Sequence, residues 1–458
     1  RAKKGAVFMF YRKMFTNLMS WKNRKSRKAL LVTGARQTGK TFLIREFGRH
    51  NYENFVEINF ITEPKAAAIF DGNLNADTLI TNLTAYLMAP LTPGKTLVFL
   101  DEIQECPQAR TAIKFLVEDG RFDYIESGSL LGVNYKEVKS YPVGYEETLR
   151  MYPLDFEEFS LANGVQDSTL SYLKECYEKG EPVRESIHTT MLDLFRHYVI
   201  TGGMPAVVQE FIDTRDIGKV LKIQKDILDL YRQDIAKYAQ YGKDRIKDIF
   251  DSIPSQLNSQ NRRFTLADIR KTARMDRYGS SFLWLADAGV ALPCFNIQEP
   301  KIPLRIGEKR NLFKLYMCDI GLLCAASMEN VQFDILNGDL SVNMGSILEN
   351  AFAQNLKSNG FDLHYLNKKN LGEIDFILQK GKEILAVEIK SGNDYTKHPA
   401  LDKALNTKGW SLDRSYVFCK GNLERKDRIT YLPWYMMMYF HQELLPNHLP
   451  ISLDLNGV

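Results

Sequence analysis

The sequence lacks the features that define several protein classes. Its 458 residues include only six cysteines, and because none of them form a C-x-x-C pair, neither a disulfide framework nor a zinc site is indicated. The longest apolar runs, such as residues 431–440, have about half of the roughly 20 residues that a membrane-spanning helix needs. There is no signal peptide pattern, repeat or low-complexity tract. These absences predict a globular cytoplasmic protein with no membrane partner.

Chain length and net charge restrict the possible classes of protein less strongly than these absences do. A chain of 458 residues is too long for one compact core, so several domains are expected. Lysine and arginine together number 60 against 56 aspartates and glutamates, which gives a net charge of +4. Such a balance permits a nucleic-acid partner without requiring one.

The most specific positive signal is a glycine-containing loop between a strand and a helix. Residues 34–41 fit the pattern G-x-x-x-x-G-K-[ST], follow the apolar strand 29–33 and precede a helical run over 41–47, which is the context of a P-loop. Backbone N–H groups of such a loop and the following helix N-terminus favour phosphate oxygens. The pattern predicts an ATP site in which Lys40 holds the β- and γ-phosphates and Thr41 holds Mg²⁺. The residues predicted to contact the nucleotide are Gly34, Ala35, Arg36, Gln37, Thr38, Gly39, Lys40, Thr41 and Phe42.

Two later strand ends add to this site. The apolar strand 97–100 is followed by Asp101 and Glu102, and this order predicts a Walker B motif in which Asp101 coordinates Mg²⁺ and Glu102 activates water. A further strand ends at Ser127, whose hydroxyl is predicted to lie near the γ-phosphate at the carboxyl edge of the sheet. An ordinary exit from strand to loop explains Ser127 nearly as well.

The alternation of elements predicts the fold class. Strands at 29–33, 55–60, 96–100 and 122–126 are separated by helical stretches, which favours a doubly wound parallel sheet covered by helices. Residues 155–250 have mostly helical periodicity, for example over 217–238. Two helices around 275–279, followed by a strand at 312–317, predict a winged-helix-like unit.

This middle region also carries a basic segment. Its cations are predicted to contact nucleic-acid phosphates in a salt-dependent and sequence-tolerant way, although a solvated charged face is the equally simple alternative. The residues concerned are Arg262, Arg263, Arg270, Lys271, Arg274 and Arg277.

A second constellation follows in the C-terminal region, where a helix from residue 344 precedes strands at 362–366, 373–378 and 383–389. A short turn joins the last two strands, so Asp375 is expected within about one residue pair of Glu388, and Lys390 shares the face of Glu388. Glu349, on the preceding helix, is a further candidate. Carboxylates that hold Mg²⁺ or Mn²⁺ beside an ammonium are what metal-dependent phosphodiester cleavage requires.

The order of these residues resembles the PD-(D/E)xK nuclease superfamily. The resemblance predicts Asp375 and Glu388 as metal ligands, and a catalytic set of Glu349, Asp375, Glu388 and Lys390. The alternative is a nuclease-like fold retained as a docking or DNA-binding platform that cuts nothing.

The chain from about residue 11 to 440 resembles AAA-type ATPases that carry an appended C-terminal domain of unknown function. The motifs that carry this resemblance are the P-loop, Leu100-Asp-Glu-Ile-Gln104, Tyr152-Pro-Leu-Asp-Phe-Glu-Glu-Phe159, Gly202-Gly-Met-Pro205, Phe313-Lys-Leu-Tyr-Met-Cys-Asp-Ile-Gly-Leu-Leu323, Gly372-Glu-Ile-Asp-Phe376 and Val387-Glu-Ile-Lys390. Members often show Gly-Arg where this chain has Gly144-Tyr145, so no arginine finger is assigned.

Together these patterns predict an α/β multidomain protein. Its parts are an N-terminal segment at 1–24, an AAA-type P-loop ATPase domain at 25–160, a helical and winged-helix-like region at 161–335, and a restriction-endonuclease-like α/β domain at 336–458. The predicted function is ATP hydrolysis with Mg²⁺ coupled to the handling of nucleic acid, DNA being favoured, and homo-oligomerisation is left open. The alternative is a nucleotide-switched scaffold whose C-terminal domain binds a partner without cleavage.

Overall fold

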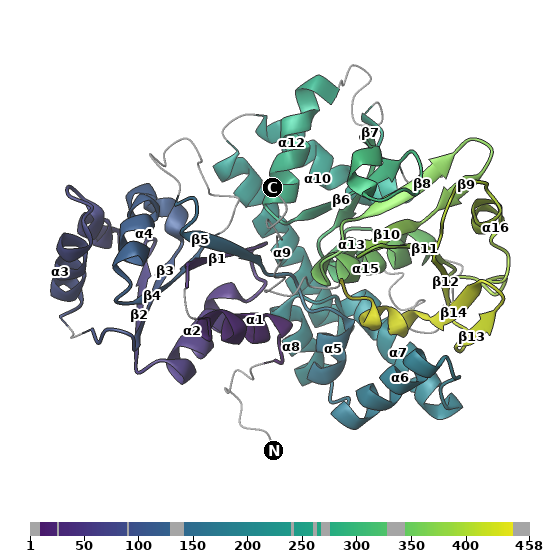
Figure 1. Cartoon of the computed structure of the whole chain (residues 1–458), viewed down its shortest axis with the longest axis horizontal. Helices are drawn as coiled ribbons and strands as arrows, with labels where there is room; N and C mark the ends of the chain where they lie inside the picture. The colour runs from purple at the N-terminus through teal and green to yellow at the C-terminus, as the bar shows by residue number, and fades with distance from the viewer. Residues whose placement is uncertain are drawn as a thin grey trace, which may run out of the picture.

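The computed structural model describes residues 10–24, 27–88, 91–128, 142–239, 242–259, 263–266, 275–327 and 344–442. The parallel sheet that carries the P-loop lies toward one end of the molecule, and the C-terminal sheet lies toward the other (Figure 1). In this view α9 Ile217–Tyr238 lies between the two sheets, whereas α6 Asp167–Lys179 and α7 Glu185–Thr201 lie below the C-terminal sheet. Within the described ranges, no helix is long and apolar enough to cross a membrane. All six cysteines are buried and no disulfide joins them.

The N-terminal sheet is parallel throughout and confirms the predicted α/β fold. Its strand order is β2-β3-β4-β1-β5. The strands are β1 Ala29–Thr33, β2 Asn54–Asn59, β3 Thr96–Asp101, β4 Asp123–Ser127 and β5 Glu146–Arg150. The edge strand β5 was not expected from the sequence, because its half-exposed residues include three charged side chains and no apolar run.

Helices cover both faces of this sheet, as the doubly wound prediction requires. Val32 and Phe99 pack toward α1 and α2, whereas Leu31 and Leu100 pack toward α3 and α4. This alternation follows from the two-residue period of a strand. The covering elements are α1 Lys13–Lys22 and α2 Lys40–Asn51 on one face, and η1 Pro64–Phe70, α3 Ala76–Leu87, η2 Ile103–Glu105 and α4 Pro107–Asp119 on the other.

The middle region is helical over 155–250, as predicted, and α9 begins and ends at the expected residues 217 and 238. Its helices are α5 Phe156–Ala162, α6 Asp167–Lys179, α7 Glu185–Thr201, α8 Pro205–Thr214, α9 Ile217–Tyr238, α10 Lys243–Leu257, α12 Met275–Asp287 and α13 Ile320–Ser327. The antiparallel pair β6 Ala291–Ile297 and β7 Glu308–Met317 follows α12, with η4 Leu304–Gly307 between them.

The winged-helix assignment stays a prediction. The first helix of the expected pair falls on residues 267–274, which lie outside the described residues together with Arg262. The basic residues Arg270, Lys271 and Arg274 are therefore also outside, and the side chain of Arg277 is not described.

The C-terminal region contains α15 Met344–Ser358 and two sheets. One sheet has the order β7-β6-β8-β9 and the other β10-β11-β12-β14-β13. The remaining elements are β8 His364–Lys368, β9 Gly372–Ile374, β10 Phe376–Lys380, β11 Glu383–Ile389, α16 Pro399–Leu405, β12 Arg414–Cys419, β13 Glu424–Lys426, β14 Ile429–Pro433 and η5 Trp434–Tyr439. The four-stranded sheet combines strands of the middle region with strands that follow α15, so the two regions share backbone hydrogen bonds.

One strand prediction here is wrong. The expected single strand 373–378 is broken at Asp375, and its halves β9 and β10 join different sheets. The carboxylate of Asp375 accepts a hydrogen bond from the backbone N–H of Ile389 at 2.7 Å. This hydrogen bond lies at the break between β9 and β10. The periodicity of the sequence does not predict the bond or the break.

Candidate functional site at the P-loop

The loop between β1 and α2 has the backbone geometry of a phosphate-binding turn. Gly34 has φ +136° and Gly39 has φ +92°, values that a residue with a Cβ adopts only with strain. A Cβ on Gly34 would also lie 2.1 Å from the carbonyl oxygen of Met151. Both the torsion angle and the close neighbour therefore require glycine at position 34.

Lys40 lies at the centre of this loop. Its side chain is buried, and Nζ donates hydrogen bonds to the carbonyl oxygens of Gly34 at 2.9 Å and Ala35 at 2.8 Å. Burial lowers the pKa of Lys40 to about 8, although the carboxylates of Glu102 and Asp101 oppose this shift. A nearby anion stabilises a buried ammonium of this kind, because the negative charge compensates for the hydration that the ammonium loses on burial.

Asp101 lies beside Thr41 at the carboxyl end of β3. Thr41 Oγ1 is 3.2 Å from Asp101 Oδ2, Asn59 Nδ2 donates to the same oxygen at 2.9 Å, and Ser127 Oγ donates to Oδ1. Burial raises the pKa of Asp101, while the hydrogen bonds from Ser127, Asn59 and Thr41 lower it. Sequence reasoning missed Asn59, although its position at the end of β2, beside β3, could have indicated it.

Glu102 follows Asp101 in a left-handed backbone conformation, with φ +54°. Gln104 Nε2 donates to Glu102 Oε2 at 2.5 Å and fixes the direction of this carboxylate. A Cβ on Gly128 would lie 2.4 Å from Gln104 Oε1, so a larger residue there would displace the glutamine. Gln104 belongs to a motif that the sequence singled out, but its role appears only in three dimensions.

The loop is also held from outside the ATPase domain. Arg12, at the start of α1, donates from Nη1 to the Thr38 carbonyl at 3.1 Å and from Nη2 to the Tyr152 carbonyl at 2.6 Å. From α9, Tyr231 donates its hydroxyl to the Arg36 carbonyl at 2.9 Å, and Asp234 pairs with Arg36. Residues far apart in sequence therefore fix this loop on several sides.

The Gly202-Gly-Met-Pro205 motif belongs to the same junction. A Cβ on Gly203 would lie 2.0 Å from the carbonyl oxygen of Leu154, and one on Gly202 would lie 2.2 Å from Asp319 Oδ1. Leu154 N donates to the Gly203 carbonyl at 2.7 Å, and Gly203 N donates to Asp319 Oδ2 at 2.6 Å. The motifs at 152–159, 202–205 and 313–323 are therefore in contact here. Glycine at positions 202 and 203 allows the three backbones to lie this close together.

The predicted nucleotide residues fit ATP and Mg²⁺ in their chemistry. The turn supplies N–H donors, Lys40 supplies a cation, and Thr41 and Asp101 supply adjacent oxygens of the kind that Mg²⁺ prefers. Gln37 is exposed with φ +65°, and Phe42 is exposed on the first turn of α2. Their contact with nucleotide stays a prediction.

In the C-terminal domain, the predicted carboxylates divide into two groups. Glu349 Oε2 accepts hydrogen bonds from Lys314 Nζ and from the Tyr316 hydroxyl, both at 3.0 Å. Lys314 Nζ also lies 2.6 Å from Glu373 Oε1, and its side chain is fully buried. The sequence did not predict Lys314, although a lysine inside the apolar run 312–317 was a signal for a buried ion pair.

Asp375, Glu388 and Lys390 form the second group. The register that pairs Phe376 with Val387 places Asp375 opposite Glu388, as the hairpin count predicted. Lys390 Nζ lies 3.2 Å from Glu388 Oε2. Burial, with a further contribution from Asp375, raises the pKa of Glu388 to about 8. Among the described residues, no group of three or more His, Cys, Asp or Glu side chains is placed to hold a metal ion.

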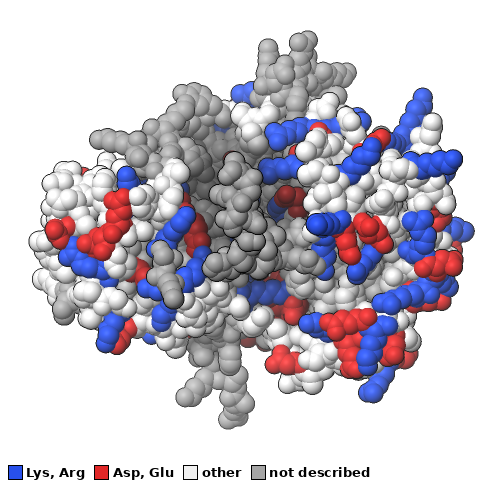
Figure 2. Space-filling view, in the orientation of Figure 1, with Lys and Arg blue, Asp and Glu red and all other residues white. Residues whose placement is uncertain are grey.

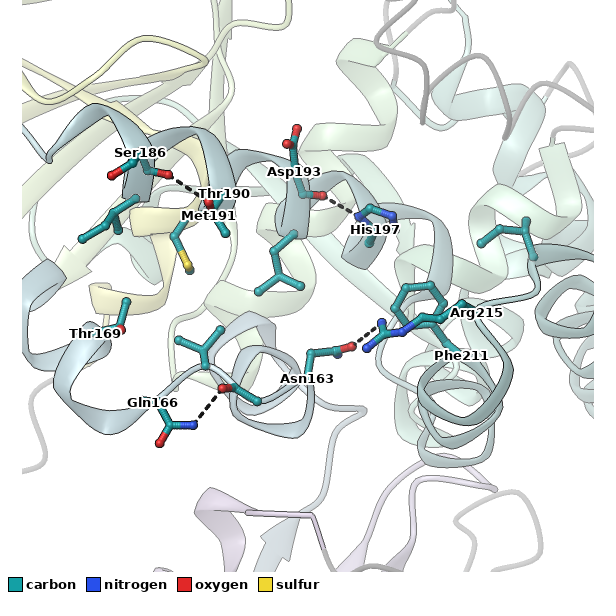
Figure 3. Close-up of a pocket in the computed structure, with 15 residues that line it drawn as sticks. Asn163, Gln166, Thr169, Ser186, Thr190, Met191, Asp193, His197, Phe211 and Arg215 are labelled. Atoms are coloured by element: carbon teal, nitrogen blue, oxygen red, sulfur yellow. Dashed lines mark hydrogen bonds between the residues drawn. The ribbon is translucent and has the colours of Figure 1, made fainter. Parts of the chain in front are cut away.

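A cavity of about 810 Å³ lies away from both sites, between the loop that follows α5 and the helices α6, α7 and α8 (Figure 3). Its polar side chains bond within the cavity wall: Arg215 Nη1 donates to Asn163 Oδ1 at 2.8 Å, and Thr190 Oγ1 donates to the Ser186 carbonyl at 2.8 Å. No residue predicted from the sequence lines it. We assign it no function.

The comparisons with known proteins agree with the geometry of the loop. Residues 26–160 match the AAA domain family, and the chain therefore contains an AAA-type P-loop ATPase domain. Residues 192–332 and 344–437 match two domains of unknown function, DUF8612 and DUF4143. These matches confirm the ATPase part of the predicted resemblance and the C-terminal domain of unknown function; they do not show the nuclease resemblance. Comparison with curated proteins finds no significant match.

The solved structures to which this chain is similar include three proteins. A Walker-type ATPase of Pyrococcus abyssi is 14% identical, with a TM-score of 0.41, over 69% of this chain and 96% of that one. The ORC1 protein of Aeropyrum pernix, solved in complex with DNA, is 13% identical, with a TM-score of 0.27, over 71% and 94%. The RuvB branch migration motor of Thermotoga maritima is 14% identical, with a TM-score of 0.29, over 62% and 89%. At these scores the similarities carry no argument about function.

Proposed function

We propose that the protein binds ATP with Mg²⁺ and hydrolyses it to drive the handling of nucleic acid. The observation that carries the ATPase part is the meeting of Lys40, Thr41, Asp101 and Glu102 at the carboxyl edge of the parallel sheet. Lys40 Nζ lies against the loop carbonyls, and Thr41 Oγ1 lies 3.2 Å from the Asp101 carboxylate. This is the edge at which doubly wound sheets bind their ligands.

Each residue has a distinct role in this proposal. Lys40 neutralises the β- and γ-phosphates. Thr41 and Asp101 would hold Mg²⁺, which would neutralise the negative charge that develops on the phosphates during the reaction. Glu102 orients and activates the attacking water, and Gln104 holds the Glu102 carboxylate in place. Asn59 and Ser127 keep Asp101 fixed through their hydrogen bonds.

Two substitutions separate binding from turnover. Lys40→Ala removes the main cation and is expected to weaken Mg²⁺-ATP binding strongly, whereas Glu102→Gln is expected to keep binding and lose hydrolysis. Calorimetry with Mg²⁺-ATP and a phosphate-release assay measure the two effects. Lys65→Ala, at an exposed lysine of η1, is the matched control. Equal ATP affinity in the wild type and Lys40→Ala would refute the site.

Nucleic acid is proposed as the substrate because of the basic segment over residues 262–277. On the face in Figure 2, Lys and Arg side chains are interspersed with Asp and Glu over the C-terminal half of the molecule. That half therefore shows no extended field of one sign on the visible, described surface, and the basic segment is the candidate for phosphate contact.

The test is a set of charge reversals compared by DNA affinity over a range of salt. The variant reverses Arg270, Lys271 and Arg274, and the control reverses three exposed lysines of α9, Lys219, Lys222 and Lys225. We expect the first variant to bind more weakly and to flatten the salt slope by about one unit for each phosphate that the protein no longer neutralises. Equal losses in both variants would refute the basic segment as the binding face.

For the C-terminal domain, the geometry favours a binding module over a nuclease. The observation is Lys314, whose buried ammonium lies between Glu349 and Glu373. A cation of the protein itself therefore neutralises Glu349, one of the four predicted catalytic residues, while Lys390 pairs with Glu388, one of the two predicted metal ligands. We expect the wild type not to nick labelled DNA in Mg²⁺ or Mn²⁺. Nicking that is lost in both Asp375→Ala and Glu388→Ala would instead establish the nuclease.

A further inference from the structure

The P-loop carries an arginine whose side chain is held by a helix of the middle region. Arg36 Nη1 lies 2.5 Å from Asp234 Oδ1, and about a quarter of the arginine side chain is exposed whereas Asp234 is buried. The hydroxyl of Tyr231 donates to the carbonyl of the same arginine at 2.9 Å. Tyr231 and Asp234 are three residues apart on α9, so they share one face of the helix. That face therefore contacts both the backbone and the side chain of one P-loop residue.

This ion pair lies close to the reacting groups. Arg36 directly follows Gly34 and Ala35, whose carbonyl oxygens accept hydrogen bonds from Lys40 Nζ at 2.9 and 2.8 Å. The Arg36–Asp234 pair therefore lies beside the loop backbone that holds the lysine of the ATP site.

Asp234 is not a fully satisfied partner. Its Oδ2 is buried and accepts no hydrogen bond within the described part of the chain. Burial raises the pKa of Asp234 even though the guanidinium of Arg36 opposes the shift. A triphosphate carries more negative charge than one carboxylate and presents paired oxygens that match the fork of an arginine. Phosphate is therefore a strong competitor for Arg36.

We propose that Arg36 is a cis-acting phosphate ligand of the bound nucleotide, and that Asp234 is a positioning residue on α9 that competes with the nucleotide for its guanidinium. Binding of ATP moves Arg36 from Asp234 to the phosphates and breaks the side-chain contact between α9 and the P-loop. The proposal rests on the ATP-binding function proposed above and adds a regulatory contact to it.

The position of α9 gives this exchange a route to the rest of the molecule. Tyr231 and Ile235 are buried in the core that the middle and C-terminal regions share. The helix packs against α8, α10 and α13, and α13 packs against α15, which carries Glu349. The helices α9, α13 and α15 therefore form a continuous packed path from Asp234 to the C-terminal domain.

The test combines nucleotide affinity with hydrogen exchange in α9. We expect Asp234→Asn, which keeps the shape and removes the charge, to bind Mg²⁺-ATP about tenfold more tightly than the wild type, because a charge-assisted bond no longer has to be broken. In an Arg36→Gln background, the same Asp234→Asn change is expected to alter affinity less than twofold. Asp229→Asn is the matched control, because Asp229 lies on the same helix and pairs with Arg232 rather than with the P-loop.

Hydrogen exchange gives a readout that does not depend on turnover. In the wild type, saturating ATP is expected to speed exchange at the C-terminal end of α9, and both Asp234→Asn and Arg36→Gln should abolish this response. An equal gain of affinity from Asp234→Asn in both backgrounds would overturn the proposal, as would unchanged exchange in a wild type that calorimetry shows to be saturated. Absence of ATP binding by the wild type would instead refute the ATP site itself.

Discussion

Replacing Lys314 by methionine removes one charge from a buried ion pair while keeping the volume of the side chain. Glu349 then loses the ammonium at 3.0 Å and keeps the hydrogen bond from the Tyr316 hydroxyl at 3.0 Å, and Glu373 is deprived of its ammonium partner at 2.6 Å. Removing one partner of a buried pair costs about 3–5 kcal/mol. Because the hydrogen bond from Tyr316 to Glu349 is kept, we expect the lower end of this range, about 3 kcal/mol.

The effect should be local, so the assay is hydrogen exchange of α15, which carries Glu349. A loss of about 3 kcal/mol in the opening free energy of this helix speeds exchange about a hundredfold, at roughly 1.4 kcal/mol for each factor of ten. Adding Glu349→Gln should recover part of the loss.

The matched control is Lys357→Met, at the end of the same helix. Lys357 Nζ pairs with Asp362 at 2.9 Å, and the side chain of Asp362 is 65% exposed. Such a pair contributes about 0–1 kcal/mol. If Lys314→Met changed exchange in α15 no more than Lys357→Met does, the argument that Lys314 neutralises Glu349 and Glu373 would be wrong.

Three further predictions concern single residues. The pKa of Glu388 is raised from 4.5 to about 8. The contribution of Glu388 to the free energy of unfolding is therefore fully present below about pH 4.5 and is lost as the pH rises through 8. Glu388→Gln should flatten this part of the pH–stability curve, measured by urea unfolding. Gly34→Ala should abolish ATP binding in calorimetry, whereas Gly72→Ala, with φ +81° and nothing within 4 Å of its Cβ, should cost only the torsional strain of about 1 kcal/mol. Ser127→Ala removes a donor to Asp101, and it should weaken Mg²⁺-dependent ATP binding about fivefold without changing Mg²⁺-free binding.

The parts of the fold that the sequence predicts are those encoded by neighbouring residues. The strand β1 and the helix α9 have the expected bounds, because a run of apolar residues and a helical period are local signals. The edge strand β5 has neither signal, since half-exposed charged residues form it. The break at Asp375 depends on a hydrogen bond to Ile389 on another strand, so periodicity alone could not show it.

The same distinction applies to the candidate site. Lys40, Thr41, Asp101 and Glu102 belong to motifs with fixed local spacing, and this spacing is enough to assign them to a nucleotide. Asp234 meets Arg36 across 198 residues of sequence, and no local pattern marks it. Lys314 pairs with Glu349 across 35 residues, and only its presence in an apolar run gave a hint.

The junction at Leu154 and Gly203 has a consequence for attempts to divide the protein. A fragment that stops after residue 160 would keep Phe156 and Phe159 but lose the residues of α7 and α8 that cover them, including Phe195, Tyr198 and Phe211. Two bare aromatic rings on a small domain promote aggregation. A chimera that exchanges the ATPase domain between related chains should therefore carry residues 151–214 with it, so that the segment and its covering helices come from the same parent.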